Sequence, residues 1–309
     1  MTVSLRIGTR GSPLALWQAE HVRACVADHH GERFGAAMLD VITTSGDRIQ
    51  DQNLAEFGGK GLFTKEIDEA LLRGDIALAV HSMKDLPTAL PAGLCLAAVL
   101  PRADVRDAFL SPVAPSLAEL PEGAVVGTSS LRRAAQVKRA RPDLRVIDFR
   151  GNVQTRLKKL SDGVADATLL AKAGLDRLGL AEAATSVLSV DDMLPAVAQG
   201  AIAIVAREGD EATRELLRPL TDGPTHAATS CERAFLAELD GSCRTPIAGL
   251  AVVEQGTVRF RGLILSPDGA QWHDVEMSGP SCDAEDIGQQ AGKDVHGRAG
   301  PEFLQTLMR

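Results

Sequence analysis

Residues 124–160 read AVVGTSSLRRAAQVKRARPDLRVIDFRGNVQTRLKKL, a stretch in which a short apolar run twice leads into a helical pattern. The run at 124–130 predicts a strand that enters a helix over 131–140. The run at 145–149 predicts a second strand, followed by a helix over about 152–160. Strands that alternate with helices in this way form largely parallel sheets, so the stretch predicts an α/β fold.

The same alternation continues on both sides of this stretch. Further strands are predicted for the apolar runs at 5–8, 38–44, 76–82, 167–171 and 202–206. The Pro-rich stretch 101–121 and the stretch 219–226 are predicted to be joints between domains.

The last third of the chain has a different pattern. Apolar runs at 247–253, 258–266 and 271–278 are joined by the short connections EQGT and PDGA. Connections of this length predict antiparallel hairpins. Helices are expected before and after them, over about 228–239 and from about 283.

Composition excludes several classes of protein. With 45% hydrophobic and 24% charged residues and no apolar stretch of roughly 18 residues, the chain is predicted to be a soluble globular protein. The N-terminus has no apolar run of signal-peptide length, so a cytoplasmic location is expected. The five cysteines fit neither a disulfide framework nor a CxxC metal site, so no structural metal is expected.

Positive charge is concentrated in one window of an acidic chain. The net charge is −8, yet residues 132–159 hold ten Lys and Arg against two Asp. A local basic patch of this kind indicates an anionic small molecule, because a nucleic-acid footprint is usually broader. A solvated helix face is the alternative, and it accounts for Lys138, Arg139, Lys158 and Lys159.

Three predicted strand-to-helix junctions carry side chains that suit an anion. Helix N-termini offer free N–H groups and the positive end of the helix dipole, and arginine can hold a carboxylate with two hydrogen bonds. For the hydroxyl side chains, plain N-capping is the alternative. The junctions contain Arg10 and Ser12; Thr128, Ser129, Ser130, Arg132 and Arg133; and Arg150 and Arg156.

Three further places in the sequence carry residues that could take part in catalysis or ligand binding. VHSMKDLP (80–87) ends a predicted strand with Ser82, Lys84 and Asp85, and Asp85 is suited to hold a developing cation or move a proton; a Lys–Asp pair at the strand end is the alternative. The glycine-rich stretch around Lys60 is a lid over a ligand or an ordinary loop. Cys243 taken alone is more typical of a packed thiol than of a nucleophile.

Ten motifs, spread over nearly the whole chain, together resemble the porphobilinogen deaminase family. They are LRIGTRGSPLALWQA (5–19), TTSGD (43–47), GGKGLFTKEID (58–68), AVHSMKDLP (79–87), VVGTSSLRR (125–133), RGNVQTRL (150–157), LAKAGLDRLG (170–179), LPAVAQGAIAI (194–204), CERAFL (231–236) and GSCRTPIAG (241–249).

The resemblance implies a fold and a division into domains. Two periplasmic-binding-protein-like (type II) α/β domains would surround a cleft, and a small C-terminal α/β domain with an antiparallel sheet would follow. The first domain would comprise 1–100 with 200–218, the second 101–199 and the third 219–309. The resemblance also implies a monomer.

The resemblance implies a reaction as well. Four porphobilinogen molecules would be condensed head to tail, each losing ammonia, to give hydroxymethylbilane for tetrapyrrole and haem synthesis. A dipyrromethane cofactor would serve as primer, joined to Cys243 by a thioether. No metal, nucleic acid or membrane is implied as a partner.

Roles for single residues follow from the same resemblance. Asp85 matches the catalytic aspartate. Positions that contact the cofactor are matched by Ser82, Lys84, Asp85, Thr128, Ser129, Ser130, Arg132, Arg133, Arg150 and Cys243. Positions that contact the substrate are matched by Arg10, Ser12, Lys60, Arg150, Arg156 and Gln199.

Four positions depart from the family pattern. Ser242, Ala248 and Ala198 stand where glycine is usual, and Lys172 stands where a small residue is usual. A Cβ at Ser242 or Ala248 is expected to strain a left-handed or tightly approached backbone. Two other functions remain open from the residues alone: a two-lobed receptor for a carboxylate ligand, and an enzyme with a cysteine nucleophile.

Overall fold

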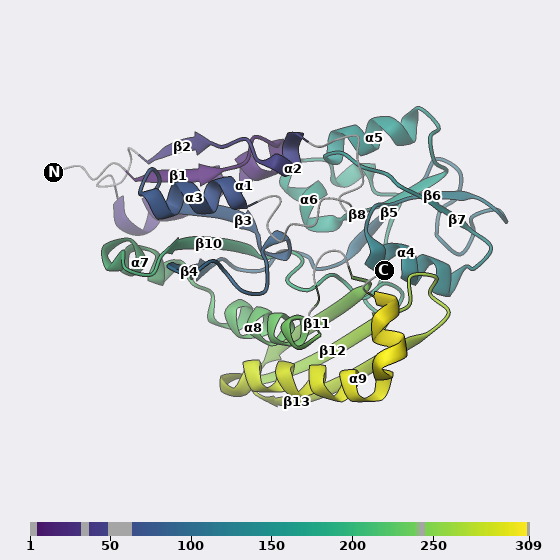
Figure 1. Ribbon diagram of the computed structural model, residues 1–309. Helices are drawn as coiled ribbons and strands as arrows, with labels where there is room; N and C mark the ends of the chain where they lie inside the picture. The colour runs from purple at the N-terminus through teal and green to yellow at the C-terminus, as the bar shows by residue number, and fades with distance from the viewer. Residues whose placement is uncertain (1–4, 32–36, 49–63, 240, 242–244, 308–309) are drawn as a thin grey trace. The chain divides into compact units, whose positions relative to one another are not determined.

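The computed structural model describes residues 5–31, 37–48, 64–239, 241 and 245–307, and its arrangement is drawn in Figure 1. The chain forms two compact units, and each contains two separate segments. The first unit consists of residues 1–103 with 201–226, and the second of 104–200 with 227–309. The three-domain division remains a prediction.

The first unit is built around a five-stranded mixed sheet with the order β2-β1-β3-β10-β4. Strand β1 pairs in parallel with β2 and β3, whereas β10 is antiparallel to both β3 and β4. The strands are β1 (Arg6–Thr9), β2 (Met38–Val41), β3 (Leu78–Ser82), β4 (Leu94–Val99) and β10 (Ile202–Arg207).

Helices cover this sheet, and its central strands are apolar enough to be buried on both faces. Ile7, Leu78 and Ile204 are fully buried in one core with Val22 and Val26 of the first helix. The helical elements are α1 (Pro13–His30), α2 (Ser45–Arg48), α3 (Lys65–Arg73), η2 (Met83–Asp85), α7 (Glu211–Leu217) and η4 (Arg218–Leu220).

The second unit contains a five-stranded mixed sheet with the order β7-β6-β8-β5-β9. Strand β6 is parallel to β7 and β8, and β5 is antiparallel to β8 and β9. The strands are β5 (Asp107–Leu110), β6 (Val125–Gly127), β7 (Arg145–Ile147), β8 (Ala167–Ala171) and β9 (Ser186–Val187). Its helices are α4 (Leu131–Ala140), α5 (Val153–Ser161), α6 (Lys172–Arg177) and η3 (Ala181–Ala183).

The two five-stranded sheets follow one plan. In each, the first of three parallel strands lies between the second and the third, and an antiparallel strand separates the third from the edge strand. This shared order confirms the predicted type II, periplasmic-binding-protein-like α/β arrangement.

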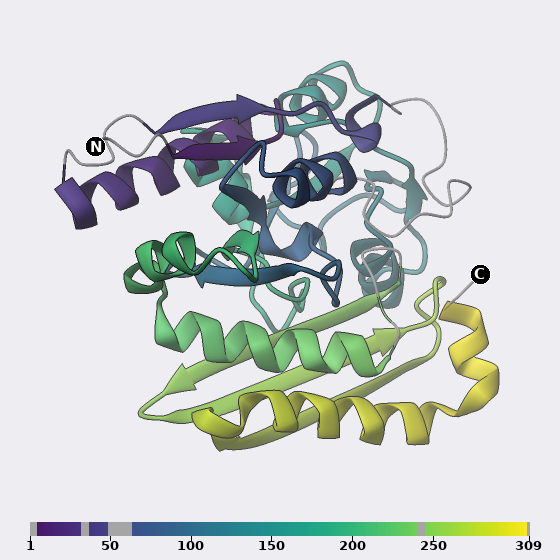
Figure 2. The ribbon, with the colours of Figure 1, turned by 60° about the vertical axis from the view of Figure 1, so that its left-hand side comes forward.

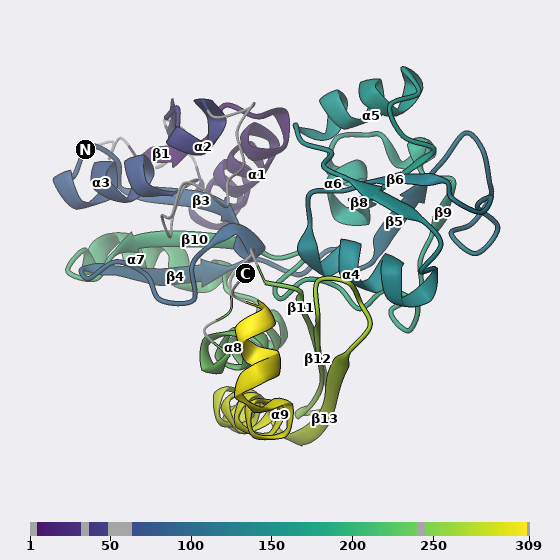
Figure 3. The ribbon, with the colours of Figure 1, turned by 45° about the vertical axis from the view of Figure 1, so that its right-hand side comes forward.

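A third sheet in the second unit is an antiparallel meander, as predicted. Its strands are β11 (Ile247–Glu254), β12 (Thr257–Leu265) and β13 (Trp272–Pro280), and η5 (Ser281–Asp283) follows them. Helices α8 (Gly223–Glu238) and α9 (Ala284–Leu307) lie side by side on one face, as Figures 2 and 3 show. A Cβ on Gly288 of α9 would lie 2.0 Å from the carbonyl oxygen of Cys231 in α8, so only glycine permits this approach.

The chain passes from the first unit to the second after residue 103, within the predicted joint 101–121. The same stretch also contains β5, a buried strand of four residues that is too short to give a recognisable pattern. One predicted boundary was wrong. Helix α8 begins at Gly223 rather than near 228. Asp222 Oδ1 accepts the Thr225 N–H at 3.0 Å, and Pro224 fits the first turn of a helix. Within the described part of the chain, no helix has the length and apolar character needed to cross a membrane.

Candidate active site

One group of predicted site residues lies where β1 and β3 of the first unit end. These strands are parallel neighbours, so their carboxyl ends lie at one edge of the sheet, where ligands of open α/β sheets bind. A small pocket of about 60 Å³ occurs here. Its polar lining comes from Arg10, Ser12, Gln18, Thr64, His81, Ser82 and Asp85. The structure therefore brings together four residues that the sequence placed in two separate motifs.

The junction between β1 and α1 is organised by its own side chains. Ser12 caps α1, and its hydroxyl oxygen accepts the Ala15 N–H at 3.3 Å. Thr9 is fully buried and donates its hydroxyl to the Ala15 carbonyl at 3.1 Å. Arg10, between them, is half-buried at the pocket. N-capping, the alternative given for this hydroxyl, is thus confirmed for Ser12.

His81 is a buried, uncharged member of this pocket. The residue is 5% exposed, and its Nε2 has no hydrogen-bond partner among the described residues. Burial, together with the positive charge of Arg10, lowers the pKa of His81 to about 4. The imidazole is therefore neutral at physiological pH. The adjacent Ser82 exchanges hydrogen bonds with Gln18, whose Nε2 lies 2.9 Å from the Ser82 hydroxyl.

Lys84 and Asp85 lie in η2, which follows β3 without a break. The single turn is tied to the sheet because the Met83 N–H donates to the Ala201 carbonyl at 3.0 Å. Asp85 is exposed and lines the pocket, whereas Lys84 is half-buried. A solvent-accessible carboxylate at the mouth of a polar pocket is able to contact a bound cationic group.

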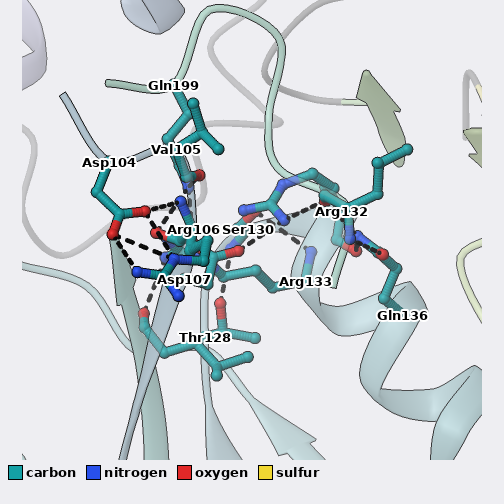
Figure 4. A network of polar contacts seen from close by, with 12 residues as sticks. Asp104, Val105, Arg106, Asp107, Thr128, Ser130, Arg132, Arg133, Gln136 and Gln199 are labelled. Carbon is teal, nitrogen blue, oxygen red and sulfur yellow. Dashed lines mark hydrogen bonds and ion pairs between the residues drawn. The ribbon is translucent and has the colours of Figure 1, made fainter. Parts of the chain in front are cut away.

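A second group of predicted residues lies at the start of α4 in the second unit, shown in Figure 4. Ser130 caps the helix and accepts the Arg133 N–H at 3.4 Å, while the Thr128 hydroxyl accepts the Ser130 N–H at 3.2 Å. The Ser129 hydroxyl accepts the Phe149 N–H at 3.0 Å. Each hydroxyl oxygen accepts a backbone N–H in the fold, and its own hydrogen remains available as a donor.

The first turn of α4 carries two buried guanidinium groups. The side chains of Arg132 and Arg133 are 4% and 6% exposed, and both pair with Asp107, which is fully buried. Arg133 Nη2 donates to Asp107 Oδ1 at 2.7 Å, and Arg132 Nη1 forms an ion pair with Oδ2 at 2.8 Å. Burial raises the pKa of Asp107, but the two guanidiniums outweigh it and hold that pKa well below its usual range.

The next junction, between β7 and α5, is more open. Asn152 caps α5 and accepts the Thr155 N–H at 2.8 Å. Arg150 is half-buried and donates to the exposed Asp148 at 2.9 Å. Arg156 lies one turn into α5 and is also half-buried. The anion-binding roles of these two arginines remain predictions.

Gln199 has a different environment from the one expected for a substrate contact. It is fully buried, and its Nε2 donates to the Val105 carbonyl at 2.7 Å and to Asp107 Oδ1 at 3.0 Å. Its predicted contact with substrate stays a prediction. Cys243 and Lys60, the predicted anchor and lid residues, lie outside the described residues.

The departures from the family pattern have different consequences. Ala248 lies in the regular strand β11, without a positive φ, and its methyl group packs in a core. The expected strain at Ala248 is therefore absent. The strained backbone is found at Ala198 instead, where φ is 59°. The Ala198 N–H donates to the buried Glu232 at 2.6 Å. Lys172 opens α6 and pairs with Asp176.

Sequence reasoning missed Asp107, Gln18 and Gln136. Gln136 joins α4 to the segment around Leu194: its Oε1 accepts the Leu194 N–H at 2.8 Å, and its Nε2 donates to the Leu194 carbonyl at 3.0 Å. Asp107 gave no usable signal, because the strand that it opens, β5, is only four residues long and shows no recognisable pattern. In the described ranges, no group of three or more His, Cys, Asp or Glu side chains is placed to hold a metal ion.

Comparison with known proteins identifies the family. The model described as "porphobilinogen deaminase, dipyromethane cofactor binding domain" matches residues 5–215, and that of the porphobilinogen deaminase C-terminal domain matches 227–296. A solved structure, the methionine-binding protein MetQ, aligns at 16% identity with a TM-score of 0.43, covering 70% of this chain and 89% of its own.

Curated relatives match nearly the full length. The chloroplastic porphobilinogen deaminase of Pisum sativum is 56% identical over 99% of this chain and 84% of its own. The porphobilinogen deaminases of Nitrobacter hamburgensis and Paracoccus denitrificans are 55% and 52% identical, over 96% and 97% of this chain and 94% and 96% of theirs. The chain belongs to the porphobilinogen deaminase family.

Proposed function

We propose that this protein condenses four porphobilinogen molecules head to tail, with loss of ammonia, and gives hydroxymethylbilane for tetrapyrrole and haem synthesis. The observation that carries the proposal is the match of the chain to both domain models of the family, one of which is named for the dipyrromethane cofactor. The dipyrromethane is joined to Cys243 by a thioether.

The residues at the start of α4 fit such a cofactor. Asp107, Arg132 and Arg133 together carry one more positive than negative charge in a buried position. In addition, Arg132 Nε is buried without a hydrogen-bond partner among the described residues. A buried excess of positive charge is stabilised by an anion, and a dipyrromethane carries several carboxylates.

The chain's own groups have distinct tasks in this reaction. When bound, the dipyrromethane supplies the pyrrole carbon to which the first new ring is joined. Carboxylates of the cofactor are held by Arg132, Arg133 and Arg150, with Ser82, Lys84, Thr128, Ser129 and Ser130 as further polar contacts. The carboxylates of the incoming substrate are bound by Arg10, Ser12, Lys60, Arg150 and Arg156.

Asp85 is the catalytic residue. Its exposed carboxylate at the pocket stabilises the positive charge that develops on the substrate as ammonia leaves. It also accepts the proton that a pyrrole ring must release when the new carbon–carbon bond forms. Burial and the charge of Arg10 lower the pKa of His81 and keep its ring neutral, and Asp85 is the acid–base group of this site.

The working form is a cytoplasmic monomer with three domains, 1–100 with 200–218, 101–199 and 219–309. Porphobilinogen is its small-molecule substrate, and nucleic acid is not a partner. The acidic net charge of −8, with an excess of Lys and Arg over Asp and Glu in the window 132–159, favours a small anionic ligand over nucleic acid.

The mass of the intact protein tests the proposal. The wild-type protein should carry extra mass equal to two linked pyrrole units, and Cys243→Ser should lack it. Asp85→Asn should retain the added mass when the primer is supplied preassembled, yet lose most turnover. An active wild-type protein without added mass would refute the tethered primer. Unmodified and inactive wild-type protein that binds polycarboxylates would indicate a receptor instead.

A further inference from the structure

We propose that Asp107 is a positioning residue for the reaction: it sets the orientation of the arginine that receives the cofactor's carboxylates. The inference rests on the proposed function, because it assigns a task within the same anion site. Asp107 was not among the residues predicted from the sequence. It opens β5, three residues after the chain enters the second unit.

Four nitrogen atoms surround this one carboxylate, three as hydrogen-bond donors to Oδ1 and one as an ion-pair partner of Oδ2 (Figure 4). Oδ1 accepts Arg133 Nη2 at 2.7 Å, Arg133 Nε at 3.2 Å and Gln199 Nε2 at 3.0 Å. Oδ2 pairs with Arg132 Nη1 at 2.8 Å. With the side chain of Asp107 fully buried, these contacts are made without competition from water.

The two arginines use their nitrogens differently. Arg133 has a partner in the fold for every guanidinium nitrogen, because Nη1 donates to the Leu169 carbonyl at 2.8 Å while Nε and Nη2 bind Asp107. Arg132 uses Nη1 for Asp107 and for the Leu194 carbonyl at 2.8 Å. Within the described residues, Arg132 Nε has no hydrogen-bond partner, and the hydrogen bond and ion pair of this side chain are both made by Nη1.

This difference gives the two arginines separate tasks. Arg133 clamps Asp107 to β8, and Asp107 in turn orients the plane of the Arg132 guanidinium. A guanidinium plane that is already fixed loses less conformational freedom when a carboxylate binds. Arg132 therefore has more donors left for the ligand than Arg133, which keeps only the second N–H of Nη1 and of Nη2.

The same carboxylate also joins both ends of the segment 104–200. Gln199, next to the end of that segment, binds Asp107 Oδ1 and the Val105 carbonyl near its start. Leu194 is bound by Arg132 and by Gln136 of the same helix. The position of Arg132 is thus tied to the two points at which the chain enters and leaves this part of the second unit.

Two variants of Asp107 test the inference, with Asp104→Asn as the matched control. Asp104 lies on the same segment, but it is partly exposed and pairs with Arg106. Asp107→Asn keeps the shape and removes the charge. Asp107→Glu keeps the charge and moves the carboxylate by about 1.5 Å, one carbon–carbon bond.

We expect Asp107→Asn to lower the fraction of folded, soluble protein that carries the dipyrromethane mass by at least about tenfold. The Asp107→Glu holoenzyme should show a KM for porphobilinogen raised about tenfold with kcat changed much less, because binding rather than chemistry is affected. Hydrogen exchange at the amides of 194–200 should be faster in both variants. Asp104→Asn should match the wild type in all three measurements.

The outcomes separate this inference from the proposed function. Absence of the pyrrole mass on the wild-type protein would refute the function itself. Normal mass on the wild type, with wild-type loading per soluble molecule in Asp107→Asn and wild-type KM in Asp107→Glu, would overturn the inference. A lower unfolding temperature alone, with loading and KM unchanged, would likewise overturn it, because Asp107 would then serve folding only.

Discussion

The burial of His81 predicts how the stability of the folded protein changes with pH, both in direction and in magnitude. The pKa of His81 is lowered from 6.5 to about 4 by burial and by the charge of Arg10. In the unfolded chain the imidazole takes up a proton near pH 6.5, but in the folded protein it stays neutral down to about pH 4. Unfolding therefore takes up a proton in this window, and acidification favours the unfolded state.

The size of the effect follows from the shift. A pKa difference of one unit corresponds to about 1.4 kcal/mol, so this shift changes the free energy of unfolding by about 3 kcal/mol in total. Of this, about 2 kcal/mol is lost between pH 6.5 and pH 5. The stability that neutral His81 contributes is present above pH 6.5 and is lost as the pH falls toward 4.

A second buried group acts in the opposite direction. Burial raises the pKa of Asp68, in α3, from 3.8 to about 6. The folded protein thus holds a proton on Asp68 that the unfolded chain releases, and this contribution is lost as the pH rises through 6. The wild-type protein should consequently show a weak dependence of stability on pH between 4 and 6, because the two effects oppose each other.

Urea unfolding of paired variants isolates each effect. The difference in unfolding free energy between the wild type and His81→Gln should shrink by about 2 kcal/mol from pH 6.5 to pH 5, since every other group cancels in the difference. Asp68→Asn should lose stability more steeply than the wild type on acidification. Titration of the His81 ring protons by NMR should give a pKa near 4. A pH-independent difference between wild type and His81→Gln, or a ring pKa near 6.5, would refute the reasoning.

Three further substitutions have matched controls in the same chain. Arg150→Leu should raise the KM for porphobilinogen about tenfold, because a substrate carboxylate loses one partner. Lys158→Leu, on the exposed face of α5, should leave the KM unchanged. Equal KM values for the two variants would show that Arg150 does not bind the substrate. Glu232→Gln should lower the free energy of unfolding in urea by about 2–4 kcal/mol. The two carboxylate oxygens of Glu232 are fully buried and accept the Ala198 and Ala251 N–H groups at 2.6 and 2.7 Å. Glu254→Gln, at an exposed position, should leave the free energy unchanged, and similar urea midpoints for the two variants would contradict a stabilising role of Glu232. Gly288→Ala should lower the unfolding temperature, because the new Cβ would meet the Cys231 carbonyl. Gly297→Ala, with open space around it on the same helix, should stabilise the protein by about 0.5–1 kcal/mol. Stabilisation by both substitutions would contradict the close approach of α8 and α9.

Local pattern was sufficient for much of the fold. The alternation of apolar runs and helical periods placed β3, α4 and β12, and the caps at Ser12 and Ser130 follow from side chains that reach only three residues along the chain. Both ends of such an interaction lie in one short stretch, so the sequence displays it directly. The short strand β5 and the start of α8 gave no such signal.

The site could be predicted in part. Motifs at the strand ends identified Arg10, Ser82 and Asp85, and the structure places all three at one pocket because β1 and β3 are neighbours. The pairing of Arg132 and Arg133 with Asp107 could not be read in this way. Their partner lies 26 residues from Arg133, on a strand inserted between β8 and β9.

The sequence by itself determined the α/β class, the antiparallel C-terminal sheet, the family and the residue types that suit a polycarboxylate. Tertiary structure decided which of those residues are buried, which donors are used within the fold and where the backbone is strained. Ala248 lost its expected strain because it lies in a regular strand, and Ala198 acquired it because a tight turn with φ 59° places its N–H against Glu232. The physical reason is the distance along the sequence over which each interaction acts. Caps and helical periodicity act over three or four residues, whereas a buried charge is stabilised by whichever side chain the strand order brings beside it.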